Sequence, residues 1–185
     1  MKKVLLLLMS FFLCFCIIDK SDCEIKAYSN YRVLSVPNFQ QSNSNTCWVA
    51  VGTAILHSKG YLITYVQYRN ACGVTYDRTA TIYEIRRGFI AYNQSHSTAI
   101  TGYLTFNQIM QQIDGYSAAV VVGWKDTSST NNTGHVVALK GYNSSNNMVY
   151  YMDPAVGTTY ILNYNTFVNY SAYSFEWYQT VYNIY

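Results

Sequence analysis

The sequence predicts an α+β protein, in which a helical first half is followed by an antiparallel β-sheet. Three observations indicate this fold class. Apolar residues recur with helical spacing between residues 46 and 115, short apolar runs separated by Gly, Asn and Ser follow, and no linker or internal repeat divides the chain. We therefore expect one domain built from two lobes, and not two separate domains.

The N-terminal stretch MKKVLLLLMSFFLCFCII has two lysines followed by an apolar run, which is typical of a secretory signal peptide. We expect residues 1–21 to be this signal, 22–32 a short N-terminal segment and 33–185 the folded domain. The protein is then secreted or held in the cell envelope. An uncleaved anchor is the alternative, because no small-x-small cleavage motif follows the run. Lipid attachment at Cys23 is disfavoured, because DKSD is a poor attachment motif.

The composition restricts the partners that the mature chain can have. Loss of Lys2 and Lys3 with the signal leaves 10 basic residues against 9 acidic ones, without a polybasic run. A near-neutral surface of this kind argues against nucleic acid and anionic lipid as partners. The 20 tyrosines fit strand residues whose hydroxyls reach solvent, with a carbohydrate or partner surface as the alternative. No metal-ligand cluster or phosphate loop is present, so we expect no cofactor and no metal.

The strongest helix prediction is CWVAVGTAILHSKG, which begins after Ser44, Asn45 or Thr46 as N-cap and stops at Gly60. Three further segments follow it. YLITYVQYRNACG is ambiguous between helix and strand, TATIYEIRRGFIAYN indicates a helix followed by an extended piece, and TFNQIMQQID indicates a short amphipathic helix. The remaining runs have strand character: SAAVVVGW, GHVVALKGYN, MVYYMDP, TTYILNY and SFEWYQTVYNIY.

The cysteines point to one free thiol. Cys14 and Cys16 leave with the signal, so three remain in an oxidising compartment, and an odd number leaves one of them over. Cys23 and Cys72 lie in stretches without other chemistry and can form a disulfide. Cys47 is then free, in the first turn of the predicted helix, where unpaired N–H groups and the helix dipole favour a thiolate.

A base for this thiol has to come from one of three histidines. His57 lies ten residues along the same helix, about 15 Å from Cys47, and cannot reach it. His96 lies in a polar stretch, where we expect it to be solvated. His135 follows a glycine at the start of an apolar strand, and Asp153 ends the next strand 18 residues later. A hairpin brings these two side chains together, so that Asp153 can orient the ring.

A glutamine precedes the thiol. Gln41 lies six residues before Cys47, and a side-chain amide there can stabilise an oxyanion together with the Cys47 backbone N–H. On the residues alone, Gln40 is an equal candidate.

The segments QSNSNTCWVA, TGHVVALKGYN and YYMDP, in this order, resemble the papain-like cysteine peptidases. The resemblance is closest to the compact bacterial branch that includes the avirulence-effector proteases of plant pathogens, and it covers roughly residues 33–185. It implies a two-lobed papain-like fold with a helical N-terminal lobe and a β C-terminal lobe. Trp48 would then pack between the lobes as a structural residue.

The resemblance also implies roles for the site residues: a nucleophile, a base, its orienter and an oxyanion-hole donor, which are Cys47, His135, Asp153 and Gln41. The spacing in this family favours Gln41 over Gln40. Two features depart from the family pattern. An inhibitory prodomain is not expected, and Asp153 stands where many relatives carry Asn.

We therefore expect a secreted, monomeric cysteine endopeptidase that hydrolyses peptide or protein substrates through a thioester acyl-enzyme. The same site could instead serve a peptide cyclase, a transpeptidase or a double-glycine leader peptidase. A non-enzymatic adhesion or inhibitor module on the same fold is the third hypothesis.

Overall fold

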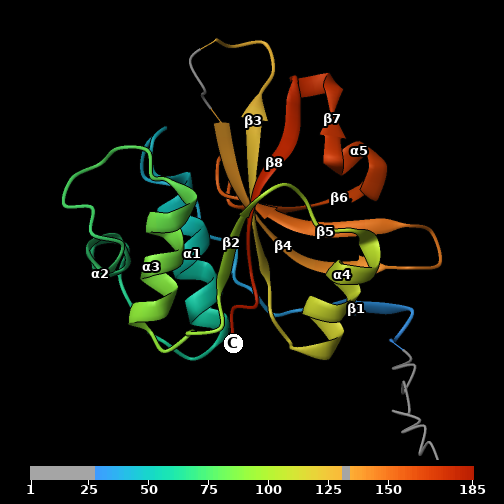
Figure 1. Ribbon diagram of the computed structural model, residues 1–185, viewed down its shortest axis with the longest axis horizontal. Coiled ribbons are helices and arrows are strands. Elements are labelled where there is room, and N and C mark those ends of the chain that lie inside the picture. Colours follow the sequence, from blue (N-terminus) through green and yellow to red (C-terminus); the bar gives the residue numbers. More distant parts are fainter. Residues whose placement is uncertain (1–27, 131–133) are drawn as a thin grey trace, which may run out of the picture.

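The computed structural model describes residues 28–130 and 134–185 (Figure 1). The predicted signal peptide, together with Cys14, Cys16 and Cys23, lies outside the described residues. A strand at Tyr31–Val33 pairs with the sheet, so the described fold includes residues that precede the predicted domain boundary at residue 33.

One antiparallel sheet forms the centre of the described chain, and the five strand predictions are confirmed. Its strand order is β2-β8-β3-β4-β5-β6, with β1 pairing with β4 and β7 with β8. The strands are β1 (Tyr31–Val33), β2 (Thr98–Thr101), β3 (Val120–Asp126), β4 (Gly134–Asn143), β5 (Met148–Asp153), β6 (Thr158–Asn163), β7 (Asn169–Tyr170) and β8 (Phe175–Tyr182).

Helices cover both faces of this sheet. Figure 1 shows α1, α2 and α3 side by side against one face, with α4 and α5 on the opposite side. The helices are α1 (Cys47–Ser58), α2 (Tyr65–Ala71), α3 (Ile82–Ala91), α4 (Phe106–Met110) and α5 (Tyr164–Val168), with a π-helical turn η1 (Gln111–Gly115) and a 3-10 turn η2 (Ser171–Tyr173). The predicted α+β class, with a helical lobe followed by a β lobe, is confirmed.

Local capping explains why the segment that was ambiguous between helix and strand is a helix. The ambiguous stretch after Gly60 becomes α2, because Thr64 and Gln67 form a reciprocal capping box at its start. The extended piece predicted at the end of TATIYEIRRGFIAYN is wrong, because α3 continues to Ala91 and a turn follows it. Its buried residues Ile82, Ile85 and Phe89 make one apolar stripe, and burying that stripe requires the helix to continue. The next strand after α3 is β2.

Two apolar cores lie on the two faces of the sheet. The first packs α1, α2 and α3 onto Val121, Ala138, Met152 and Val181. The second lies on the opposite face, where Trp124, Tyr142, Phe167 and Trp177 are buried beside residues of α4 and η1. Because α1 packs against β4 on one side and against α2 and α3 on the other, residues 47–56 are all buried. The nucleophile candidate therefore sits on the most firmly packed helix.

Cys72 is fully buried inside the helical lobe and forms no disulfide with another described residue, while its predicted partner Cys23 lies outside the described residues, so that the pairing stays a prediction. Its sulfur packs against α3 at Gly88, where a Cβ would overlap it. Burial raises the pKa of the Cys72 thiol to about 12. Spacing along the chain could not reveal this, because the pocket for Cys72 is made by a helix that follows it.

The close approach of α1 and α2 depends on a glycine. A Cβ at Gly52 would overlap the ring of Tyr68, which is fully buried and donates its hydroxyl to the backbone oxygen of Ile85 at 3.0 Å. Glycine in a helix interior normally costs about 1 kcal/mol relative to alanine. At this position the cost is offset because the missing side chain admits the tyrosine ring.

We expect Gly52→Ala to lower the free energy of unfolding by about 1–3 kcal/mol, because overpacking against Tyr68 outweighs the gain in helix propensity. Urea unfolding followed by circular dichroism measures this. Ser58→Ala, at an exposed position of the same helix, is the matched control and should change stability by less than about 0.5 kcal/mol. A stabilising effect of Gly52→Ala would contradict the packing argument.

Candidate active site

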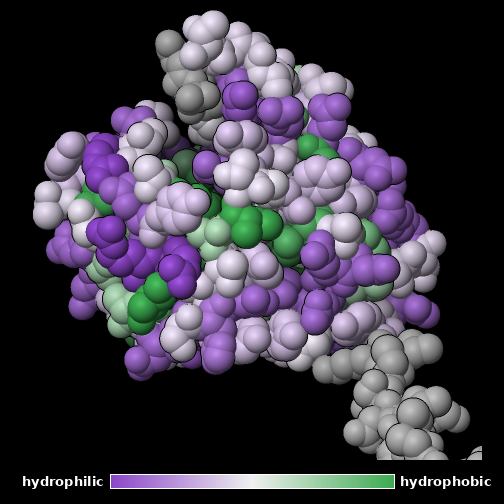
Figure 2. Space-filling view, in the orientation of Figure 1, coloured by the Kyte–Doolittle hydropathy of each residue, from purple (hydrophilic) through white to green (hydrophobic). Residues whose placement is uncertain are grey.

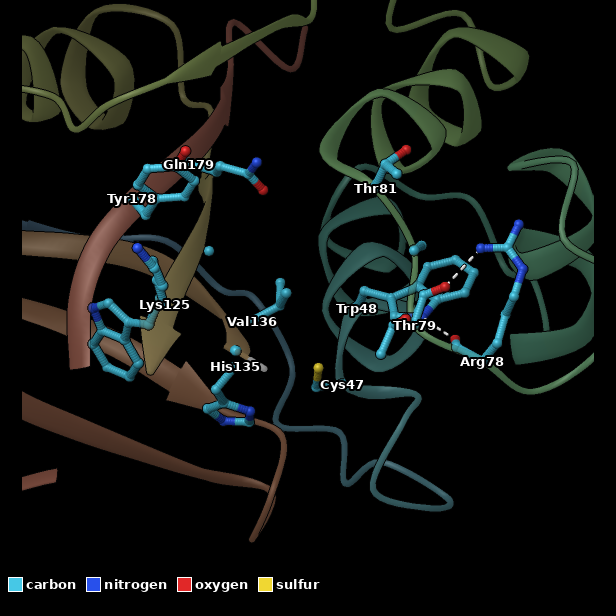
Figure 3. Close-up of a pocket in the computed structure, with 14 residues that line it drawn as sticks. Cys47, Trp48, Arg78, Thr79, Thr81, Lys125, His135, Val136, Tyr178 and Gln179 are labelled. Atoms are coloured by element: carbon cyan, nitrogen blue, oxygen red, sulfur yellow. Dashed lines mark hydrogen bonds between the residues drawn. The ribbon is translucent and has the colours of Figure 1, made fainter. Parts of the chain in front are cut away.

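A cleft of about 630 Å³ lies where the two lobes meet. One wall is helical and consists of Cys47, Trp48 and residues 78–81. The other is formed by the sheet, with residues 123–125 of β3, 134–136 of β4 and 178–179 of β8. Figure 3 shows Cys47 and His135 facing each other from the two walls. The cleft thus brings together residues that lie far apart in the sequence.

Cys47 is the first residue of α1, as predicted, and its side chain is 7% exposed. Thr46 is the N-cap residue, but its side chain does not cap the helix, because its hydroxyl donates to the Asn43 backbone oxygen at 3.0 Å. The amide hydrogens of the first turn are therefore not taken up by a side-chain cap. At this end of α1 the helix dipole favours negative charge.

His135 lies on β4 directly opposite Trp124 of β3. Its ring stacks on Phe175, with centroids 6.3 Å apart, and Phe175 in turn stacks on Trp124 at 5.8 Å. The side chain is 16% exposed. Close packing requires a glycine at the preceding position, Gly134, since a Cβ there would overlap the backbone oxygen of Trp124. Aromatic contacts thus restrict the orientation of the imidazole.

Asp153 ends β5 and holds one nitrogen of this imidazole. Its Oδ1 lies 2.6 Å from His135 Nε2 and also accepts a hydrogen bond from the Ala155 backbone N–H at 2.9 Å. With Nε2 engaged, Nδ1 is the ring nitrogen that can interact with Cys47. The structure therefore brings the predicted Cys47, His135 and Asp153 together as one chain of contacts.

These contacts alter the protonation of the histidine. Burial by itself lowers the pKa of His135, but the hydrogen bonds to Asp153 and Cys47 outweigh burial and raise the pKa to about 9. Burial likewise opposes ionisation of Asp153, but the hydrogen bond with His135 holds the pKa of Asp153 below its usual range. At neutral pH the pair is therefore an imidazolium and a carboxylate.

Gln41 lies outside the residues that line the cleft, in the loop that leads to α1. Its Nε2 donates to the Asn43 backbone oxygen at 2.8 Å, and its Oε1 is buried without a partner among the described residues. Its backbone N–H donates to the Pro154 oxygen at 2.8 Å. The loop before Cys47 is therefore fastened to the turn that carries Asp153. Gln40 differs, since its amide donates to the Ala155 oxygen at 3.3 Å.

The other two histidines lie away from the cleft. His57 Nε2 is 2.7 Å from the Ile63 oxygen, near the end of α1. His96 is exposed and stacks on Tyr185 at 5.0 Å. Trp48 is 1% exposed, and its indole N–H donates to the backbone oxygens of Asn45 and Arg78 at 3.0 and 2.9 Å. Trp48 thus holds the helical wall in place.

The sequence reasoning missed the sheet wall of the cleft. Gly123, Lys125 and Gln179 line it, and Phe175 stacks on His135. A signal for two of them was present. Val121 is a core residue, and two and four positions later the same strand face carries a glycine and a lysine, which interrupts the apolar pattern of that face. The roles of Phe175 and Gln179 depend on a distant strand pairing and had no local signal.

In residues 28–130 and 134–185, no group of three or more His, Cys, Asp or Glu side chains is arranged to hold a metal ion. Across the same ranges, no helix combines the length and apolar character that spanning a membrane requires. Figure 2 shows that the face of the molecule seen in Figure 1 is largely hydrophilic, with apolar residues gathered near its middle.

Comparison with known proteins agrees with the fold. The model of the Peptidase C39 like family matches residues 33–184. No curated protein sequence matches the chain.

Two solved structures resemble it. The interpain A cysteine protease of Prevotella intermedia, an active wild-type form, has a TM-score of 0.67 at 11% identity, over 85% of this chain and 96% of that chain. A double glycine motif protease from an AMS/PCAT transporter, in complex with the leader peptide, has a TM-score of 0.53 at 20% identity, over 81% and 92%.

The similar structures show the same fold, and the family match covers nearly the whole described chain. The chain belongs to the Peptidase C39 like family and is a papain-like cysteine peptidase.

Proposed function

We propose that the protein is a secreted endopeptidase in which Cys47, His135, Asp153 and Gln41 carry out the reaction. The observation that carries this proposal is the hydrogen-bonded chain from Asp153 through His135 to Cys47 at the bottom of a cleft between two lobes. An imidazolium beside the sulfur and the start of α1 both favour a thiolate. Secretion is supported by the N-terminal sequence.

The first half of the reaction forms a thioester. The Cys47 sulfur attacks the carbonyl carbon of the scissile peptide bond, and the carbonyl oxygen takes up the negative charge. The Cys47 backbone N–H and the Gln41 side-chain amide donate to this oxyanion. His135 gives its Nδ1 proton to the departing amine nitrogen as the carbon–nitrogen bond breaks.

The second half releases the acyl group. His135, now neutral, accepts a proton from a water molecule that attacks the thioester carbon, and the carbon–sulfur bond breaks. The carboxylic acid leaves, and the thiolate and imidazolium are restored. Asp153 stabilises the imidazolium in both halves and remains ionised itself.

Peptides are the proposed substrates. One solved neighbour is a double glycine motif protease in complex with a leader peptide. Removal of such leaders is therefore a second candidate activity, and transfer of the acyl group to an amine is a third. Product masses, measured with and without an added amine nucleophile, separate hydrolysis from transfer.

Cys47→Ala and His135→Ala should abolish peptide cleavage, because each removes a group that forms or breaks a bond. A thiol-reactive epoxide peptide, read out by intact mass, tests the same site without a known substrate. It should add once to the wild type near neutral pH, slowly to His135→Ala and not at all to Cys47→Ala. Cys72 should stay unlabelled because it is buried and its pKa is raised. Full activity of Cys47→Ala would disprove the mechanism.

Gln41→Ala should lower kcat by about a hundredfold, the usual loss for one oxyanion-hole donor, with little change in KM. Gln40→Ala is the matched control, since its amide bonds to a surface carbonyl and should affect kcat less than about threefold. The reverse result would assign the amide to Gln40.

The pH dependence of kcat/KM should have an alkaline limb near the His135 pKa of about 9, because above it the imidazolium loses the proton that the leaving amine needs. Asp153→Asn keeps an oxygen for the hydrogen bond but removes the negative charge. It should shift this limb to lower pH by on the order of one unit.

Asp114→Asn serves as the control for this shift, because its carboxylate pairs with Arg32 at 2.8 Å and not with His135. Its alkaline limb should coincide with that of the wild type. An unchanged limb in Asp153→Asn would show that the carboxylate does not set the protonation of His135.

A further inference from the structure

Lys125 carries a positive charge into the cleft without a carboxylate partner. It lines the sheet wall, and no Asp or Glu lies within ion-pair distance of it in residues 28–130 and 134–185. Glu176 lies opposite Lys125 in the register of β3 and β8, but the two side chains do not form an ion pair. Its ammonium lies over the Tyr178 ring, 5.3 Å from the centroid. Figure 3 shows Lys125 beside Tyr178 on this wall.

The second cation of the cleft, Arg78, is already neutralised. Its guanidinium pairs with Glu84 at 2.6 Å and donates to the Thr79 oxygen at 2.7 Å. These bonds hold the helical wall together, so Arg78 is occupied as a structural residue. The residues that line the cleft include no carboxylate. Lys125 is therefore the lining cation that a ligand can reach without breaking an ion pair.

The geometry of the strands leaves space for a ligand beside Lys125. Gly123 lies on the same face of β3 two residues earlier, and any side chain there would narrow the cleft towards Gln179, whose Cβ would lie 3.3 Å away. The register of β3 and β8 shifts between Gly123 and Trp124, so β8 has one extra residue, Tyr178. The bulge lets both Tyr178 and Gln179 line the cleft.

We propose that Lys125 makes this cleft selective for peptides that present an acidic side chain, Asp or Glu, to the sheet wall. The carboxylate forms an ion pair with the Lys125 ammonium, and the Gln179 amide, which also lines the wall, can donate a second hydrogen bond. Tyr178 holds the lysine stem in place. This inference rests on the proposed function, because it assigns a substrate class to the same cleft.

The test starts from cleavage-site profiling with a proteome-derived peptide library, followed by mass spectrometry. One position of the cleaved sites should be enriched in Asp and Glu. Two fluorogenic peptides are then made that differ only by Glu or Gln at that position. Both carry a C-terminal amide, so that the side chain is the only carboxylate that differs. The wild type should cleave the Glu peptide with a kcat/KM about fivefold higher, which is the upper end of what an exposed ion pair contributes.

Lys125→Gln should bring this ratio close to one, because the Glu peptide then no longer meets a cation on the sheet wall. Lys125→Glu should reverse the preference towards a Lys-containing peptide. The matched control is Lys59→Gln, which removes the same charge at the far end of α1, and it should keep the wild-type ratio. High salt should reduce the preference of the wild type, because screening weakens ion pairs.

The outcomes separate this inference from the proposed function. Cys47-dependent cleavage with a Glu-to-Gln ratio of one, or a ratio that survives Lys125→Gln, overturns the inference and leaves the peptidase intact. A preference seen only for peptides with a free C-terminal carboxylate also overturns it. If no library peptide is cleaved and an epoxide peptide does not label Cys47, both proposals fail.

Discussion

The hydrogen bond between Asp153 and His135 is the interaction on which the rest of the site depends. It fixes Nε2 of the ring 2.6 Å from the carboxylate and leaves Nδ1 for the thiol. It also belongs to a larger joint, since the turn after Asp153 accepts the Gln41 backbone N–H through Pro154. One short turn therefore positions the proposed base His135 directly and the loop of the proposed oxyanion donor Gln41 indirectly. A change in this turn should disturb both.

Glycines make this joint possible. Gly157 has a φ of +63°, and a Cβ there would lie 3.1 Å from the Cβ of Gln40, so the turn and the glutamine loop approach each other closely. Gly134 likewise permits a close approach beside His135, where the backbone of β3 at Trp124 leaves no room for a Cβ. Close packing of the backbone beside Asp153 and beside His135 thus depends on two positions that have no side chain.

Charge is distributed unevenly over the cleft. Arg78 is held by Glu84, and His135 is held by Asp153, so both cations have a carboxylate of their own. Lys125 has an aromatic ring in place of a carboxylate among the described residues. A peptide that enters the cleft therefore meets one cation free to pair with it. This asymmetry links the substrate class to the strand register, because the bulge at Tyr178 places the ring under the lysine.

The sequence by itself determined the α+β class, the helix that begins at Cys47 and the strands that carry His135 and Asp153, because helical and strand periodicity are local properties. It also reduced the choice of base to His135, because His57 is held on the same helix at a fixed distance. Only the tertiary structure decided that Cys72 is buried, since α3 closes over it. The stacking of Phe175 on His135 and the cleft position of Lys125 likewise come from pairing between distant strands. Such pairing depends on the whole fold and leaves no pattern in the neighbouring residues.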